Sequence, residues 1–81
     1  MFYVYILKSL KNNRFYIGST NNLTRRLFEH NNGQSKYTRH TKLFKLLYKE
    51  KFITRKEAVN REKYLKTGNG RDEVKKILRG L

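Results

Sequence analysis

The sequence predicts a small α+β fold in which helices flank a three-stranded antiparallel sheet, in the order β-β-α-β-α-α. Two observations support this prediction. Short runs rich in Tyr, Val, Ile and Phe suit the pleated surface of a strand. Between these runs lie helix-capping residues, followed by apolar side chains at helical spacing. We expect residues 1–81 to form one domain, because a chain this short can bury only a thin core.

The first two strands are predicted at Tyr3–Lys8 and Phe15–Gly18, joined into a hairpin by a polar turn that contains an Asn-Asn pair. Successive side chains of a strand point to opposite faces. Alternation assigns one face of the first strand to Phe2, Val4 and Ile6 and the other face to Tyr3, Tyr5 and Leu7. On the second strand, Tyr16 and Gly18 share a face. The tyrosines on that side are either half-buried core residues or part of a site.

A first helix is predicted at about Leu23–Asn31, after the capping residues Ser19–Asn22 and before a stop near Gly33. At 100° per residue, Leu23 and Leu27 mark the stripe that this helix buries. The helix is therefore expected to pack one face against the sheet.

Two polar side chains lie beside that stripe. Arg26 falls at its edge and His30 close to it, and their spacing of four makes them neighbours on the helix surface. Arg25 and Glu29 are predicted to face solvent. Arg26 either snorkels past apolar neighbours or belongs to a site.

A third strand is predicted from Leu43 to Ile53, and one face of it should be buried. The residues assigned to that face are Phe44, Leu46, Tyr48 and Phe52. The segment Thr54–Glu57 then matches a capping box. A second helix should follow, run to about Lys66 and end before the Gly68–Gly70 segment.

The last helix is predicted at about Arg71–Leu81. Its apolar stripe consists of Val74, Ile77, Leu78 and Leu81. Asp72 and Glu73 are expected in its first turn, where negative charge suits the helix dipole. This helix is interpreted as a packing element.

Glu62 is the main anomaly of the second helix. It projects into the apolar arc that Ala58, Val59 and Leu65 define. A carboxylate directed towards a core costs several kcal/mol unless it is paired or coordinates a metal. Glu62 is thus predicted to be either a structural ion-pair partner or a metal ligand.

The charge balance points to a polyanionic partner. Twenty Lys and Arg against six Asp and Glu give a net charge of +14, which favours nucleic acid. In the polar segment 32–42, Lys36, Tyr37 and Arg39 offer cations for phosphates and an aromatic face for a base, although a solvated linker has the same composition. The chain has no Cys and no apolar run near the ~20 residues of a membrane span. We expect a cytoplasmic protein that does not contact membranes.

Three stretches resemble the GIY-YIG nuclease family: Tyr3-Val4-Tyr5, Tyr16-Ile17-Gly18 and the run Asn22–Asn31. The resemblance covers the chain from Tyr3 to about Arg71 and is closest to the small stand-alone bacterial proteins of this superfamily. The chain is also similar to the N-terminal catalytic domain of the excision-repair nuclease C subunit. One departure is that Tyr3 replaces the glycine of the first motif.

The resemblance implies a GIY-YIG endonuclease-like fold and a role for each matching position. Tyr5 and Tyr16 would line the site, and one of them would help to deprotonate the attacking water. Arg26 would be the essential arginine, with His30 assisting in proton transfer or phosphate contact. Glu62 would be the single carboxylate that binds the divalent cation, Mg²⁺ or alternatively Mn²⁺.

The resemblance further implies that duplex or branched DNA is the substrate, with no small-molecule cofactor. Gly18 and Asn22 would serve as structural positions of the motifs. Asn69 is a candidate for the late polar residue that closes many of these sites. The implied reaction is hydrolysis of DNA phosphodiester bonds at a site with one metal ion.

A rival hypothesis is a basic DNA- or RNA-binding module without catalysis. It explains the charge and the 32–42 segment but leaves Glu62 and the Arg26–His30 pair unexplained. A third hypothesis is a nuclease fold reused to recruit a partner protein. Only the nuclease hypothesis gives each of these side chains a role.

Overall fold

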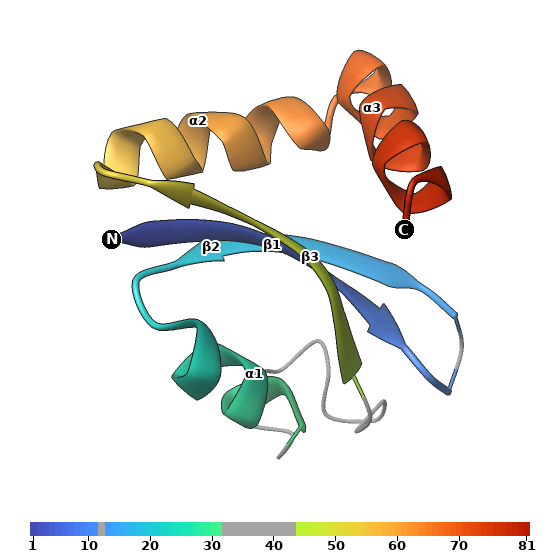
Figure 1. The fold of residues 1–81 in the computed structure, drawn as a ribbon, viewed down its shortest axis with the longest axis horizontal. Helices are drawn as coiled ribbons and strands as arrows, with labels where there is room; N and C mark the ends of the chain where they lie inside the picture. The colour runs from blue at the N-terminus through green and yellow to red at the C-terminus, as the bar shows by residue number, and fades with distance from the viewer. Residues whose placement is uncertain (12, 32–43) are drawn as a thin grey trace.

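The computed structural model describes residues 1–11, 13–31 and 44–81 and has the predicted α+β architecture (Figure 1). Its elements are β1 (Phe2–Ser9), β2 (Phe15–Thr20), α1 (Leu23–Asn31), β3 (Phe44–Phe52), α2 (Arg55–Leu65) and α3 (Gly68–Arg79). The strands form one antiparallel sheet in the order β2-β1-β3. Helix α1 covers one face of this sheet, and α2 and α3 cover the other (Figure 1). None of the described helices has the length and apolar character to cross a membrane.

The hairpin of β1 and β2 confirms the predicted alternation. Tyr5 lies opposite Gly18 and Leu7 lies opposite Tyr16. Since directly opposed residues share a face, Tyr5, Gly18 and Tyr16 are all on the face that α1 covers. The buried residues on the α2–α3 face are Val4, Ile6, Ala58, Leu65 and Val74. Those on the α1 face are Tyr5, Leu7 and Phe44, with Tyr16, Leu23, Leu27 and Leu46 packed against them.

The prediction of one continuous buried face on the third strand is wrong. Tyr48 opposes Ile6 in β1, whereas Leu46 opposes Leu7, the next residue of β1. Leu47 is therefore an extra residue that forms a β-bulge. Leu46 packs in the cluster under α1, but Tyr48 packs in the cluster under α2 and α3. The bulge lets β3 contribute side chains to both clusters.

Helix α2 begins at the predicted N-cap, although the reciprocal bond from the Thr54 backbone N–H to Glu57 is absent among the described contacts. Thr54 is the N-cap, and its Oγ1 accepts a hydrogen bond from the Glu57 backbone N–H at 3.2 Å. The same hydroxyl donates to Glu57 Oε1 at 2.8 Å. The helix ends at Leu65 with Lys66 as its C-cap, close to the predicted end.

Helix α3 begins at Gly68, earlier than the predicted start at Arg71. Thr67 caps it by accepting a hydrogen bond from the Gly70 backbone N–H at 3.1 Å. Gly70 then lies so close to the end of α2 that an added Cβ would overlap the carbonyl of Tyr64. Gly70 is needed for this close approach, and the Gly68–Gly70 segment forms the first turn of α3 instead of a break. Asp72 and Glu73 consequently lie beyond the first turn, contrary to the prediction.

A cluster of charged side chains joins α2 to β3 and α3. Arg61 Nε and Nη2 donate to the two carboxylate oxygens of Glu50 at 2.8 and 3.0 Å, and Arg61 Nη1 pairs with Glu73. The Tyr48 hydroxyl also donates to Glu50, at 2.6 Å. The hydrogen bond from Arg61 lowers the pKa of the Glu50 carboxyl, and the hydrogen bond to Glu50 raises the pKa of Tyr48 to about 12. These contacts hold α2, the helix that carries Glu62, against the sheet.

Candidate active site

Five of the predicted site residues lie around β2, an edge strand of the sheet: Tyr5, Tyr16, Gly18, Arg26 and Glu62. Side chains alternate along this strand, so Gly18 faces α1, opposite Tyr5. Ser19 pairs with Val4 and therefore faces α2. Groups from both faces can thus meet at neighbouring positions of one exposed edge.

The ring of Tyr5 passes directly over Gly18. Tyr5 is only 4% exposed, and a Cβ added at Gly18 would lie 2.6 Å from Tyr5 Cζ and closer still to its hydroxyl oxygen. Any side chain at position 18 would therefore displace the ring. Gly18 allows a buried tyrosine of the central strand to place its hydroxyl at the β2 edge.

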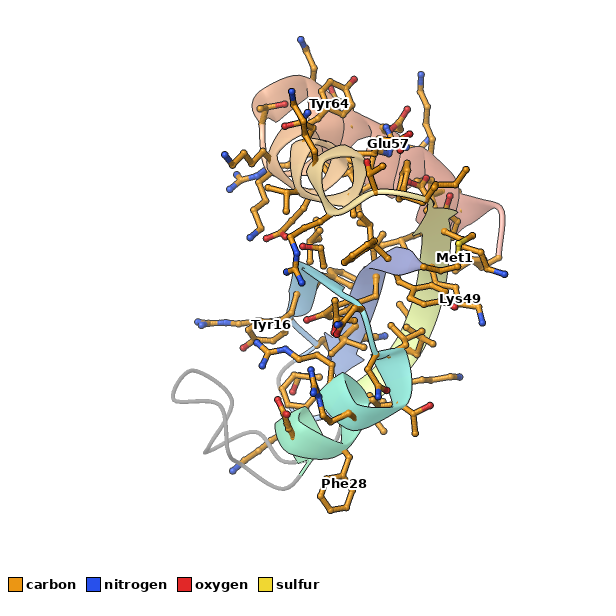
Figure 2. The ribbon with its side chains drawn as sticks, turned by 90° about the vertical axis from the view of Figure 1, so that its left-hand side faces the viewer. Met1, Tyr16, Phe28, Lys49, Glu57 and Tyr64 are labelled. Atoms are coloured by element: carbon orange, nitrogen blue, oxygen red, sulfur yellow. The ribbon has the colours of Figure 1, made fainter. Side chains whose placement is uncertain are left out.

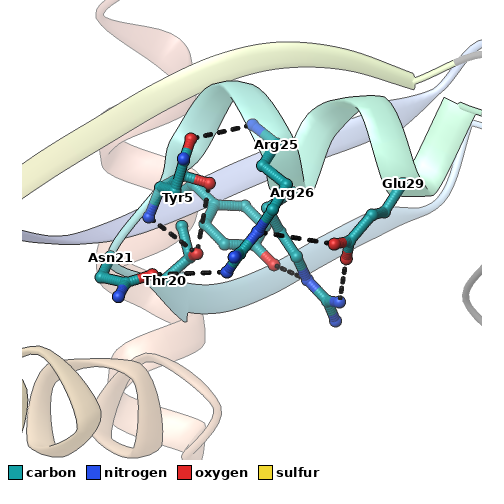
Figure 3. Close-up of polar contacts among 7 residues, drawn as sticks. Tyr5, Thr20, Asn21, Arg25, Arg26 and Glu29 are labelled. Carbon is teal, nitrogen blue, oxygen red and sulfur yellow. Dashed lines mark hydrogen bonds and ion pairs between the residues drawn. The ribbon is translucent and has the colours of Figure 1, made fainter.

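Arg26 in α1 holds this hydroxyl in place (Figure 3). Its Nε donates to Tyr5 Oη at 3.3 Å and its Nη1 donates to Glu29 Oε2 at 3.1 Å. An arginine guanidinium is always charged, and the hydrogen bond to Tyr5 is the main cause that raises the pKa of Arg26 further. Its side chain remains 40% exposed. The guanidinium is thus oriented by two partners yet accessible to a ligand.

The prediction that Glu29 simply faces solvent is wrong. Its side chain is 29% exposed and pairs with Arg26 and, at 3.6 Å, with Arg25. The sequence does contain a signal for the Arg26–Glu29 pair, because residues three positions apart are neighbours on a helix surface. Glu29 therefore orients the arginine of the candidate site.

The start of α1 is fixed by the capping residues that follow β2 (Figure 3). Asn22 Oδ1 accepts a hydrogen bond from the Arg25 backbone N–H at 3.0 Å, so Asn22 caps the helix as predicted. The Asn22 backbone N–H in turn donates to Thr20 Oγ1 at 3.1 Å. Thr20 itself belongs to β2 and not to the cap. This junction sets the position of Arg26 relative to the edge strand.

Tyr16 lies on the same face of β2 as Gly18 and on the same side of the sheet as Tyr5. Its ring packs edge-on against Phe44, with 5.3 Å between ring centroids. Figure 2 shows Tyr16 at the level of the sheet, between α1 and the two C-terminal helices. Both tyrosines are therefore partly core residues, and both also belong to the surroundings of the β2 edge.

Glu62 reaches the same edge from α2. Ser19 Oγ donates to Glu62 Oε1 at 2.6 Å, and Lys66 Nζ donates to Glu62 Oε2 at 2.7 Å. Burial would raise the pKa of the Glu62 carboxyl, but the hydrogen bonds from Lys66 and Ser19 and the charge of Lys63 outweigh it and lower the pKa. The Glu62 side chain is 22% exposed and that of Lys66 is 53% exposed. Glu62 is an ionised carboxylate held by a strand residue and by one half-exposed lysine.

The sequence does not predict the contact with Ser19, because its capping propensity favours a place in the helix cap. Alternation along β2, extended by one residue beyond Gly18, would have placed Ser19 on the face that α2 covers. The sheet separates Glu62 from the Tyr5–Arg26 pair, since they approach β2 from opposite faces. A ligand that contacts both must therefore sit on the open side of β2.

Several predicted residues lie outside these contacts. The backbone of His30 belongs to α1, but its side chain is outside the described part of the structure. Lys36, Tyr37 and Arg39 lie outside the described residues altogether. Asn69 is exposed in the first turn of α3. The roles assigned to these residues stay predictions.

A metal at this edge would depend on a single carboxylate. Within residues 1–11, 13–31 and 44–81, no group of three or more His, Cys, Asp or Glu side chains could hold a metal ion. Glu62 nevertheless fits one divalent cation, because it is ionised, partly exposed and free to exchange its surface lysine for another positive charge. Water and substrate oxygens would have to supply the remaining ligands.

Comparisons with known proteins identify the family. The model of the GIY-YIG catalytic domain matches residues 1–76. The UPF0213 protein of Staphylococcus saprophyticus is 38% identical over 79 residues, which cover 96% of this chain and 95% of the relative. The UPF0213 protein of Clostridium perfringens is 51% identical over 67 residues, 82% of this chain and 71% of the relative. No solved structure gives a significant match. The three-stranded sheet with its three helices is consistent with this match, and the chain belongs to the GIY-YIG family, a family of nucleases.

Proposed function

We propose that this protein is a metal-dependent endonuclease that hydrolyses DNA phosphodiester bonds at the β2 edge. The observation that most supports the proposal is the hydrogen bond from Arg26 to Tyr5 directly over Gly18, which gathers three motif positions at one point. Membership of a nuclease family gives this arrangement a reaction class. The net charge of +14 favours a polyanionic substrate.

Hydrolysis of a phosphodiester needs an activated water, neutralisation of the charge on the pentavalent phosphate and stabilisation of the leaving oxygen. Arg26 is assigned to the second task. Nε and Nη1 contact Tyr5 and Glu29, and the planar guanidinium carries further N–H groups that suit a non-bridging phosphate oxygen. Orientation by two partners reduces the loss of side-chain freedom when the phosphate binds.

The hydroxyl groups of Tyr5 and Tyr16 are assigned to the attacking water. Both residues lie on the α1 face of the sheet, and Tyr5 Oη is held by Arg26 at 3.3 Å. His30 comes one helical turn after Arg26 and is assigned as the relay that removes the proton. In this arrangement the proton leaves on the side of the sheet that α1 covers.

Glu62 is assigned to hold the divalent cation, Mg²⁺ or Mn²⁺. A Mg²⁺ ion is commonly bound by one or two carboxylates together with waters and substrate phosphate oxygens, which matches a lone ionised carboxylate. Such an ion supplies Lewis-acid stabilisation of the charge on the leaving oxygen. A single carboxylate favours one metal ion over a two-metal arrangement, which usually needs several carboxylates.

The substitution Glu62→Gln separates an enzyme from a binding module. Parent protein is incubated with supercoiled, branched and single-stranded DNA in Mg²⁺ or EDTA, and cleavage is expected only with Mg²⁺. Glu62→Gln should abolish cleavage and leave DNA binding intact, since it removes the charge that holds the cation. Because Lys66 is half exposed, loss of its ion pair should cost less than about 1 kcal/mol of stability.

Glu57→Gln is the matched control, because it makes the same charge change on the same helix and glutamine also completes a capping box. It should cleave at the parental rate. Metal-independent binding without cleavage of any of these substrates would refute the proposal and favour the non-catalytic binding module. A drop of ~3–5 kcal/mol in the stability of Glu62→Gln would make Glu62 a structural ion-pair partner.

A further inference from the structure

A groove of about 600 Å³ opens beside the candidate active site, between β2 and α3. Its floor is apolar and includes Phe15 and Ile17 from β2 and Leu78 from α3. Phe15 is 48% exposed although it is a large aromatic residue. The groove therefore presents an aromatic ring to solvent.

The rim of this groove is cationic. Arg14 precedes β2, Lys66 follows α2, and Arg71 and Lys75 lie one turn apart on α3. These four residues are exposed, and none of the described residues that line the groove is acidic. A ligand that matches this surface has an apolar, flat part and more than one negative charge.

We propose that the groove binds an unpaired nucleotide of the DNA, with its base on the apolar floor and the adjoining phosphates on the cationic rim. Stacking of bases on exposed aromatic rings and contacts between phosphates and Lys or Arg are the two interactions by which proteins hold single-stranded nucleic acid. A base inside a duplex is stacked and paired, so it cannot enter such a groove. The groove thus selects DNA with a single-stranded segment.

The groove adjoins the candidate active site. Lys66 lines the groove and donates to Glu62 at 2.7 Å, and Tyr16 belongs both to the lining and to the β2 edge. An unpaired nucleotide here would lie next to the bond that is cut. The position of this nucleotide next to the scissile bond rests on the proposed function. If it is correct, the substrate is DNA that is unpaired beside the scissile bond.

DNA binding measured in EDTA tests the groove, because removal of the divalent cation prevents cleavage during the measurement. The probes are a fluorescein-labelled single-stranded oligonucleotide and a blunt duplex with the same number of phosphates, compared by fluorescence anisotropy at one salt concentration. The single strand should bind at least about fivefold more tightly to the parent, since stacking adds to the phosphate contacts. Phe15→Ala should remove most of this preference and leave duplex binding unchanged.

Lys75→Gln and Lys76→Gln form a matched pair on α3. Both remove one positive charge, but only Lys75 lines the groove. Lys75→Gln should weaken single-strand binding at least about threefold more than Lys76→Gln, because only it removes a phosphate contact. Equal effects of the two variants, or equal affinity of the parent for both probes, would overturn the inference.

Cleavage in Mg²⁺ separates the two proposals. Metal-dependent cleavage with no preference for single strands would overturn the groove inference and leave the proposed function intact. Selective single-strand binding that depends on Phe15 and Lys75, without cleavage, would support the groove and refute the nuclease. Preferential cutting beside an unpaired segment, lost in Phe15→Ala, is the outcome expected if both are correct.

Discussion

Replacing Gly18 with alanine tests the arrangement on which the candidate site depends. The new Cβ would lie 2.6 Å from Tyr5 Cζ, roughly 1 Å short of the 3.5–4.0 Å that carbon atoms keep at contact. Tyr5 is 4% exposed and packed on Leu7 and Phe44, so its ring can move only by disturbing the core under α1. Such overpacking costs about 1–3 kcal/mol.

The same displacement should remove the hydrogen bond between Arg26 and Tyr5. Its length of 3.3 Å is already long for a hydrogen bond, so a further shift would break it. A displacement of this size in a catalytic group lowers the rate about 100-fold. Gly18→Ala is therefore expected to lose activity even at temperatures where it is fully folded.

Thermal unfolding and cleavage of DNA in Mg²⁺ measure the two effects. A loss of 1–3 kcal/mol should lower the melting temperature by roughly 5–20 °C in a domain of this size. Gly68→Ala is the control, because no atom lies within 4 Å of its added Cβ, and alanine should stabilise the start of α3 by up to ~1 kcal/mol. Parental stability and activity in Gly18→Ala would refute the placement of Tyr5 over Gly18.

Three further predictions concern the charged side chains. Arg61→Leu should lower the free energy of unfolding by about 3 kcal/mol in urea titrations, because it leaves the largely buried Glu50 without its arginine. Arg25→Leu should cost less than about 0.5 kcal/mol, since Arg25 is largely exposed and Glu29 keeps its pair with Arg26. The difference in unfolding free energy between the parent and Arg61→Leu should be largest above about pH 5 and should decrease as the pH falls. The reason is that the pKa of Glu50 is lowered in the folded parent, so the stabilisation from the ion pair is lost as this carboxyl is protonated. A constant difference down to about pH 3 would contradict the assignment of this ion pair. Arg26→Lys keeps the charge but not the planar fork, so cleavage should fall at least about 100-fold while the salt dependence of DNA binding stays the same; retention of the parental rate would show that any cation suffices.

Local patterns were sufficient for most of the elements. The alternation in β1 and β2, the cap at Asn22 and the N-cap at Thr54 depend on residues that are close in sequence, and each is confirmed. The shared face of Tyr5, Gly18 and Tyr16 follows from the period of a strand and needs no knowledge of the helices. Periodicity also placed Arg26 beside the buried stripe of α1.

Contacts between distant elements were beyond those patterns. The bulge at Leu47 lets β3 stay paired with β1 while its side chains pack in the clusters on both faces of the sheet. The sequence of β3 alone does not show this requirement. The start of α3 depends on how closely Gly70 can approach the end of α2. Both features are consequences of packing.

For the candidate site, the sequence by itself determined which residues are anomalous, namely an arginine at the edge of an apolar stripe and a glutamate within an apolar arc. The tertiary structure decided what they meet. Ser19 and Glu62 are 43 positions apart in the chain, and only the docking of α2 on the sheet brings them within 2.6 Å. The tertiary structure also decided that Glu62 and Arg26 approach the edge strand from opposite faces, because α1 and α2 cover opposite sides of the sheet.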